Sequence, residues 1–231
     1  MTTTLITGAN KGLGKRAAER LVAAGHSVLL GSRDPQRGRA AAEEVGARLV
    51  VVDVTSDESV AAAAAQVREM VGHIDVLVNN AGIVGVRKPA GEVTADDIRL
   101  VHETNVLGVV RMVHAFLPLL EASGNPVVVN VTSGMGSLSR VTDPDRVESS
   151  FAGLAYQSSK SALNMLTVQY AKAFPAIRFN AVDPGYTATD FNNHRGTQTV
   201  DEGTDAIVEL ASIGPNGPTG GYFDRAGRVP W

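Results

Sequence analysis

The sequence predicts a doubly wound α/β fold, in which a parallel sheet of about seven strands carries helices on both faces. Short runs rich in Val, Leu and Ile recur along the chain without polar alternation, which is typical of parallel strands covered on both faces. Each run is followed by a longer, Ala-rich stretch with the apolar spacing of a helix. Regular alternation of strand and helix indicates a doubly wound sheet.

The elements can be assigned in chain order. The expected strands are the apolar runs Thr3–Thr7, Ser27–Gly31, Leu49–Asp53, Ile74–Val78, Val127–Val131, Ile177–Val182 and Gly221–Asp224. The expected helices are Leu13–Ala24, Pro35–Val45, Ser56–Val71, Thr94–Ala122, Leu154–Ala173 and Glu202–Ser212. The second helix has a well-marked start, because Asp34 suits the N-cap and Pro35 the first turn. Pro118 is expected to bend the fourth helix.

Length and composition narrow the class of protein. The 231 residues, 44% hydrophobic and 19% charged, fit one globular domain over residues 1–231, and no segment has the composition of an interdomain linker. A net charge of −3 provides no basic field for a nucleic acid. The absence of cysteine excludes a disulfide framework and a thiol nucleophile.

The sequence predicts neither a metal site nor a membrane or secreted location. The five histidines are scattered without metal-ligand spacing, so we expect no metal site. The longest apolar run, Ala61–Ala65, is too short to span a bilayer, and the N-terminus lacks the pattern of a signal peptide. These features predict a soluble, cytoplasmic protein with no membrane contact.

A glycine-rich turn lies between the first expected strand and the first expected helix. Its sequence is Thr7-Gly8-Ala9-Asn10-Lys11-Gly12-Leu13-Gly14. The three glycines allow a tight turn and a close approach to a pyrophosphate, whose charge a helix N-terminus favours. A P-loop is excluded, because it requires glycine in place of Ala9 and Ser or Thr in place of Arg16. A glycine-rich turn that binds no ligand is the alternative.

Several motifs, taken in order, resemble the short-chain dehydrogenase/reductase family. They are the Gly8–Gly14 turn, Asn79-Asn80-Ala81-Gly82 after the fourth strand and Tyr156-x-x-x-Lys160. Single residues in the same order are Asp53, Asn105, Ser133, Pro184-Gly185, Thr187 and Thr189. Asn10-Lys11 and Ser32-Arg33-Asp34 look most like the carbonyl-reductase branch. The resemblance covers essentially the whole chain and implies a Rossmann-type domain with an integrated active site.

The resemblance implies an oxidoreductase that moves a hydride between a nicotinamide cofactor and a small ketone, aldehyde or secondary alcohol. Tyr156 would be the general acid and base. Lys160 lies four residues later on the same helix face, where its ammonium would lower the pKa of the Tyr156 phenol; by resemblance it also holds the cofactor ribose. Ser133 would position the substrate oxygen, and Asn105 would hold a water that relays protons to Lys160.

Two other functions are alternatives to this one. The first is a dinucleotide-binding regulatory protein that senses redox state without turnover, and it is disfavoured because a sensor has no need of Tyr156. The second is an epimerase or dehydratase, which is disfavoured because the C-terminal region is short for a nucleotide-sugar subdomain.

The expected cofactor is NADP(H) rather than NAD(H). Neutral Ser32 stands where an acid would bond the ribose 2′-hydroxyl of NAD(H), and Arg33 follows it. Lys11 is expected to reach the same ribose, so that two cations would bind a 2′-phosphate. We assign Asp34 to the N-cap. The remaining expected cofactor contacts are Gly8, Asn10, Gly12, Leu13, Gly14, Asp53, Val54, Asn80, Ala81, Gly82, Tyr156, Lys160, Pro184, Gly185, Thr187 and Thr189.

Two loop segments are expected to set substrate access and assembly. The interval from Ser133 to Tyr156 is 23 residues, longer than is usual in the family, with Val141–Ser150 as the excess. Carbonyl reductases carry a larger insertion there, which hinders helix-pair association, so a homo-oligomer is left open. The segment Tyr186–Thr199 is expected to be a mobile lid, followed by Asp201 as the N-cap of the last helix. Apolar residues in these loops, Met135, Leu138, Phe151, Tyr186 and Phe191, favour an apolar substrate.

Overall fold

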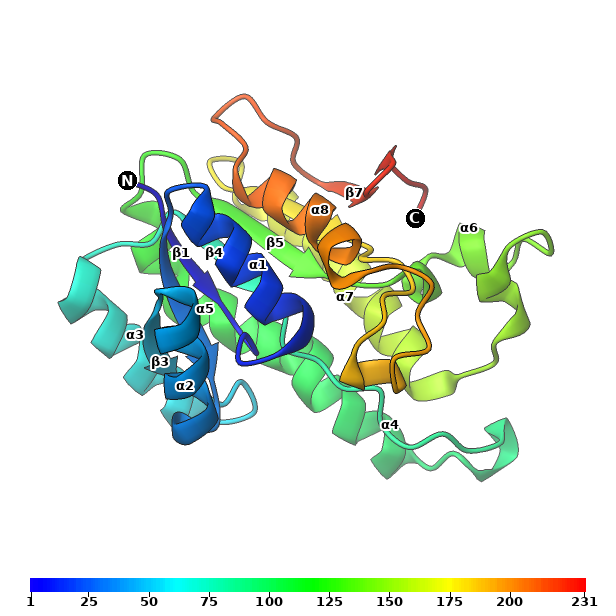
Figure 1. Cartoon of the computed structure of the whole chain (residues 1–231). Helices are drawn as coiled ribbons and strands as arrows, with labels where there is room; N and C mark the ends of the chain where they lie inside the picture. The colour runs from blue at the N-terminus through cyan, green and yellow to red at the C-terminus, as the bar shows by residue number, and fades with distance from the viewer.

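The computed structural model describes residues 1–231, and a single eight-stranded sheet of order β3-β2-β1-β4-β5-β6-β7-β8 runs through its centre (Figure 1). The strands are β1 (Thr3–Ile6), β2 (Ser27–Ser32), β3 (Arg48–Val51), β4 (Val76–Asn79), β5 (Val127–Val131), β6 (Arg178–Val182), β7 (Gly221–Asp224) and β8 (Gly227–Arg228). All neighbouring strands are parallel except β8, which pairs antiparallel with β7. The predicted doubly wound fold is confirmed. The eighth strand was not predicted, because its two residues form no apolar run.

Helices cover both faces of this sheet (Figure 1). The main helices are α1 (Gly12–Ala23), α2 (Pro35–Val45), α3 (Asp57–Val71), α4 (Ala95–His102), α5 (Gly108–Glu121), α6 (Leu138–Val141), α7 (Leu154–Ala173) and α8 (Val200–Ala211). Short turns of 3₁₀ helix are η1 (Ala90–Glu92), η3 (Gly134–Gly136), η4 (Val147–Ser150) and η5 (Asp190–Asn192). No helix combines the length and the apolar character needed to cross a membrane.

The sheet divides the apolar interior into two cores. Leu5 and Val128 point into the core formed with α3, α5 and α7, whereas Ile6 and Val129 point into the core formed with α1, α2 and α8. Side chains alternate between the faces of a strand, so a strand buried on both faces must be apolar at every position. This is why the strands of the sequence show apolar runs rather than alternation.

The fourth expected helix, Thr94–Ala122, is interrupted in the structure. A π-helical turn, η2 (Glu103–Leu107), separates α4 from α5, and Asn105 is completely buried within it. An inserted π turn adds a residue to the helix and re-aims the side chains around it, and such turns often mark functional sites. Pro118 lies inside α5, which continues to Glu121.

The start of the last helix differs from the prediction. Thr199, not Asp201, is the N-cap of α8, and its hydroxyl accepts the Glu202 N–H while the Glu202 carboxylate accepts the Thr199 N–H. The Asp201 carboxylate instead pairs with Arg16 of α1 at 2.5 Å. The prediction failed because a threonine followed three residues later by glutamate forms a complete capping box, which binds two N–H groups at once.

The cap of α2 generates a stability prediction. The Asp34 carboxylate accepts the N–H groups of Gln36 and Arg37 at 3.0 Å, and Pro35 occupies the first turn, as predicted. We expect Asp34→Ala to lower the free energy of unfolding by about 1 kcal/mol, because two helix N–H groups lose their acceptor. Asp34→Asn keeps an N-cap acceptor and is expected to stay within a few tenths of a kcal/mol of wild type. Urea unfolding of both variants checks this, and equal losses in the two would contradict the capping role.

Candidate active site

The residues singled out from the sequence lie at one edge of the sheet, where the parallel strands end. The glycine-rich turn follows β1, Asn80–Gly82 follows β4, Ser133 follows β5, and Pro184-Gly185 follows β6. The chain order reverses between β1 and β4, because β2 and β3 lie on one side and β4 to β7 on the other. In open α/β sheets, ligands bind in the crevice at such a switch point.

The glycine-rich turn is joined to the loop after β4. The Asn80 side-chain amide donates to the carbonyls of Thr7 and Gly8 at 2.9 and 3.1 Å. The Thr7 hydroxyl accepts the N–H groups of Asn80 and Ala81, both at 3.0 Å. Gly14 packs against this junction so closely that a Cβ there would collide with the Asn80 amide. This role of Thr7 was not predicted from the sequence, although its position just before Gly8 is a usable signal.

The start of α1 has the properties of an anion site. A turn that binds a dinucleotide needs these properties, because it must accept the charge of the pyrophosphate. Gly8 and Gly12 have φ of +62° and +55°, which favour glycine. Lys11 is the N-cap of α1, and no side chain caps the helix N–H groups. The first turn contains no acidic residue, so nothing competes with an anion there. A Cβ on Gly12 would meet only the Thr189 side chain, at 3.8 Å. These features fit a bound pyrophosphate.

The segment after β2 separates the two residues expected at a 2′-phosphate. Ser32 is buried, and its hydroxyl donates to the Asp34 carbonyl at 2.9 Å and accepts the Asp34 N–H at 3.2 Å. Arg33 is exposed and forms no ion pair. Lys11 is also exposed, but its ammonium lies 3.3 Å from the Asp190 carboxylate. Arg33 is therefore free to meet an anion, whereas Lys11 must first leave Asp190.

Asp53 and Val54 follow β3, which ends at Val51 rather than at Asp53 as expected. The Asp53 carboxylate accepts the backbone N–H and the hydroxyl of Thr55 at 2.9 and 2.7 Å, and the Thr55 N–H lowers the pKa of Asp53. Val54 is buried and packs against Gly108 at the start of α5. Asn10 is half-buried in the glycine turn, and Leu13 of α1 lies close to Gly203 of α8.

Tyr156 and Lys160 lie one turn apart on α7, as predicted. The Lys160 Nζ is 5.7 Å from the centroid of the Tyr156 ring. It donates to the Val131 carbonyl at 2.8 Å, and no carboxylate lies within 4 Å of it. Lys160 is only 4% exposed, and this burial lowers the pKa of its ammonium to about 8. A buried lysine without an acidic partner is costly and is typical of functional sites.

The pKa of Tyr156 differs from the sequence-based prediction. Burial raises it to about 12, and the Ser133 hydroxyl opposes this increase only in part. The decrease that we predicted from Lys160 is therefore wrong for the free chain. The reason is that the phenolate loses its hydration at this position, while the Lys160 ammonium is directed to the Val131 carbonyl and loses its proton near pH 8.

Asn105 joins the loop after β4 to α7. Its side-chain oxygen accepts the Ile83 N–H at 2.8 Å, and its amide donates to the Ile83 carbonyl at 2.9 Å and to the Ser159 hydroxyl at 3.0 Å. A Cβ on Gly82 would lie 3.3 Å from the Asn105 oxygen and 3.6 Å from the Lys160 ammonium. Both amide N–H groups are used, so the side chain retains a single acceptor lone pair for the expected water relay. Ser159, whose role was not predicted from the sequence, accepts the second of these amide N–H bonds.

The segment 186–199 lies over both halves of the site. Gly185 has φ of +70°, and the Thr187 hydroxyl donates to the Pro184 carbonyl at 2.9 Å. Thr189 caps η5, the short helix that carries Asp190 and Phe191. The ring of Phe191 lies 5.9 Å from the ring of Tyr156, and Asp190 pairs with Lys11 as described above. The expected lid thus contacts the tyrosine and the glycine turn, and its mobility stays a prediction.

The chain is similar to known proteins in sequence and in structure. Residues 2–199 match the model of the protein family described as "short chain dehydrogenase". The chain is 33% identical to "Short-chain dehydrogenase/reductase 1" of Saponaria officinalis, over 98% of this chain and 95% of the relative. It is 32% identical to a (+)-neomenthol dehydrogenase of Arabidopsis thaliana, over 96% and 95%. The NADPH-bound carbonyl reductase from chicken fatty liver has a similar structure, with a TM-score of 0.87 and 26% identity over 100% of this chain and 99% of that one.

The burial of Lys160 generates a pH prediction. The pKa of Lys160 lies near 8 in the folded chain and near 10.4 in an unfolded one, so between these values the unfolded chain binds more protons and stability rises with pH. Lys160→Met removes this contribution. We expect the stability of wild type relative to Lys160→Met to increase by about 2 kcal/mol from pH 7 to pH 9.5. Urea unfolding of both proteins at the two pH values measures the difference; a difference that does not change with pH would contradict the low pKa.

Proposed function

The chain belongs to the short-chain dehydrogenase family, and we propose that within it this protein reduces ketones or aldehydes with NADPH, using Tyr156 as the proton donor. The observation that carries the proposal is that Tyr156, Lys160 and Ser133 meet at the edge of the sheet that also holds the start of α1. There, α1 has no side-chain cap and no acidic residue in its first turn. The similarity to a carbonyl reductase and to a neomenthol dehydrogenase supports this class of reaction.

Ser133, Tyr156 and Lys160 have separate roles in the proposed reduction. When bound, the cofactor supplies the hydride that reduces the carbonyl carbon. The Ser133 hydroxyl bonds the carbonyl oxygen and orients it toward the Tyr156 phenol. Tyr156 then gives its proton to the oxygen as negative charge develops there. A pKa of about 12 keeps the phenol protonated at neutral pH, which suits a proton donor. By resemblance to the family, the Lys160 ammonium, 5.7 Å from the centroid of the Tyr156 ring, would hold the cofactor ribose beside the phenol.

The proposed preference for NADP(H) rests on Arg33 and Asp34. The Arg33 guanidinium forms no ion pair and can bind a phosphate with two parallel hydrogen bonds. The Asp34 carboxylate is engaged by two helix N–H groups, so it is poorly placed to accept a ribose hydroxyl. Lys11 would add a second cation after leaving Asp190.

A regulatory protein that binds the dinucleotide without turnover is the second candidate. It would require the glycine turn but not a buried lysine beside a tyrosine. An assay of NADPH oxidation with a panel of aldehydes, ketones and quinones separates the two candidates. The half-exposed rings of Tyr186, Phe191 and Phe151 favour the apolar members of that panel.

Tyr156→Phe tests the general-acid role. We expect the rate of carbonyl reduction to fall at least 100-fold, because the ring stays but its proton is lost. The dissociation constant for NADPH, followed by nicotinamide fluorescence, is expected to change by less than about threefold. Tyr170→Phe is the matched control, since Tyr170 lies at the opposite end of α7 from Tyr156 and packs against Phe174 and Phe179. A Tyr156→Phe enzyme with more than about a hundredth of the wild-type rate would overturn the assignment.

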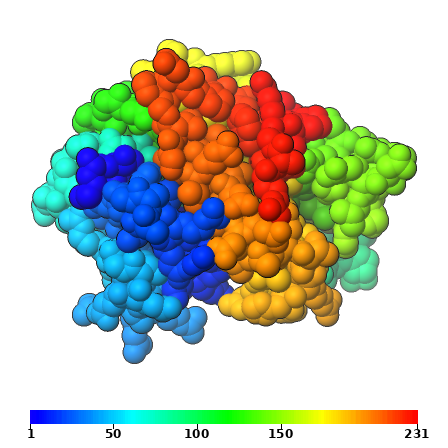
Figure 2. Space-filling view, turned by 45° about the horizontal axis from the view of Figure 1, so that its top comes forward, coloured from blue at the N-terminus to red at the C-terminus, as the bar shows by residue number.

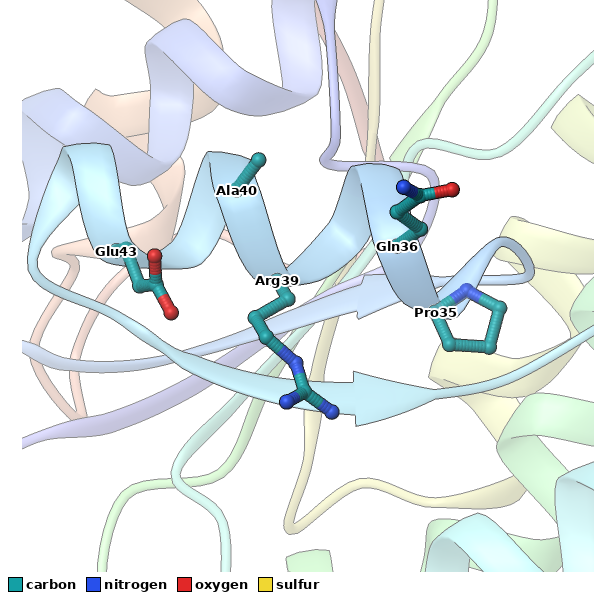
Figure 3. A pocket seen from close by; sticks show the side chains of 5 residues that line it. All are labelled: Pro35, Gln36, Arg39, Ala40 and Glu43. Carbon is teal, nitrogen blue, oxygen red and sulfur yellow. The ribbon is translucent and has the colours of Figure 1, made fainter.

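Arg33→Ala tests the cofactor preference. We expect the ratio of kcat/KM for NADPH over NADH to exceed one in wild type. The substitution should lower that ratio about tenfold or more through a raised KM for NADPH, because a charged hydrogen-bonding partner of the phosphate is lost. Arg39→Ala is the control, because Arg39 lies with Gln36 and Glu43 around a shallow hollow on the outer side of α2 (Figure 3). A wild-type ratio at or below one would refute the preference.

A further inference from the structure

A group of charged side chains, three of them buried, lies next to the turn that follows Ser133. Arg140 of α6 is 7% exposed, and its guanidinium contacts the carboxylates of Asp183 and Asp224, both at 2.7 Å. Glu148 of η4 is also buried and lies 3.7 Å from the same guanidinium, while Arg146 pairs with Glu148 at 2.9 Å. We call these five residues the Arg140 cluster. It joins the carboxyl ends of β6 and β7 to the segment Val141–Ser150.

Asp183 connects this cluster to two loops of the active site. Its carboxylate accepts the Gly185 N–H at 2.9 Å and lies against Gly134, where an added Cβ would come within 2.9 Å of one of its oxygens. Gly134 directly follows Ser133, and Gly185 belongs to the turn after β6. One carboxylate therefore contacts both the Ser133 turn and the Pro184-Gly185 turn. Arg140 in turn compensates the charge of this carboxylate.

The turn that follows Ser133 is closely packed on both sides. A Cβ on Gly134 would lie 2.7 Å from the Glu148 carboxylate and 2.9 Å from that of Asp183. On the other side, a Cβ on Gly136 would lie 2.7 Å from the backbone of Lys160. The turn Gly134–Gly136 is thus enclosed between the Arg140 cluster and α7.

Side chains of α7 also hydrogen-bond to this turn. The Gly136 carbonyl accepts the Ser161 hydroxyl at 2.9 Å and the Asn164 amide at 3.1 Å. These two residues follow Lys160 on the helix that also carries Tyr156. The position of Ser133 relative to Tyr156 is therefore set from both sides, by α7 and by the Arg140 cluster.

We propose that Arg140 and Asp183 are positioning residues, which fix Ser133 relative to Tyr156 and to the Pro184-Gly185 turn. The proposal rests on the proposed reductase function. It also gives a role to the segment Val141–Ser150, which supplies the buried carboxylate of Glu148. A planar guanidinium can contact two carboxylates at once, whereas an ammonium is a point charge. In the space-filling view, the C-terminal residues lie beside this segment, where Ser137 and Ser139 donate to the carbonyls of Pro230 and Trp231 (Figure 2).

The kinetic test compares Arg140→Met, Arg140→Lys and Asp183→Asn with Asp145→Asn, an exposed carboxylate of the same segment outside the cluster. Rates are divided by the number of NADPH sites counted by titration, so that unfolded protein does not contribute. We expect kcat per site to fall at least tenfold in Arg140→Met and Asp183→Asn, with a smaller fall in Arg140→Lys. The KM for NADPH is expected to change less than threefold, and Asp145→Asn is expected to match wild type.

A kcat per site in Arg140→Met equal to wild type would overturn the proposal, since a purely structural role lowers the number of folded sites and not the rate of each. A fall in kcat equalled by Asp145→Asn would overturn it too.

Amide hydrogen exchange gives a readout that does not depend on turnover. We expect peptides covering residues 133–137 and 184–188 to exchange at least ten times faster in Arg140→Met than in wild type or Asp145→Asn, with β1 and β4 unchanged. Equal exchange in these peptides would contradict the proposal even if wild type reduced no carbonyl compound. Absence of turnover in wild type with accelerated exchange in the variant would instead refute the proposed function and leave the positioning role supported.

Discussion

The buried ammonium of Lys160 is the interaction on which the rest of the site depends. An ammonium removed from water without a carboxylate partner is unstable, and its pKa falls to about 8 for that reason. Its one hydrogen-bond acceptor is the Val131 carbonyl at the end of β5, two residues before Ser133. The lysine therefore joins the helix of Tyr156 to the strand that leads to Ser133. A neutral packing residue could not hold these elements and also supply a charge.

The surroundings of Lys160 show how the fold maintains this arrangement. On one side, Asn105 uses the π-helical turn to reach the backbone of Ile83, which keeps Gly82 close to the ammonium. On the other side, the Ser133 turn separates Lys160 from a group of three carboxylates and two guanidinium groups around Arg140. The charge of Asp183 also contributes to the raised pKa of Tyr156. The charge of Asp183 thus opposes the phenolate of Tyr156, and burial opposes it more strongly.

Local patterns in the sequence predicted most of the fold but only part of the site. The apolar runs placed seven strands, and Asp34-Pro35 placed the start of α2, because each depends on neighbouring residues. The π turn at Asn105 could not be predicted, since it depends on a hydrogen bond to Ile83, distant in sequence. The increase in the pKa of Tyr156 depends on burial by the folded chain, and spacing alone suggested the opposite. The Arg140 cluster escaped detection because its charges are spread over four separate segments.

The ionisation of Tyr156 is the most direct test of how burial acts on this site. The absorbance difference at 295 nm between wild type and Tyr156→Phe, followed from pH 7 to pH 11, reports on that phenol alone. In the free protein we expect no ionisation of Tyr156 below about pH 11, because burial raises the pKa of the phenol to about 12. With saturating NADP⁺, whose oxidised ring is positively charged, the midpoint is expected to fall below pH 10. A midpoint at or below pH 10 in the free protein, or one that NADP⁺ leaves unchanged, would show that burial does not control the ionisation of Tyr156.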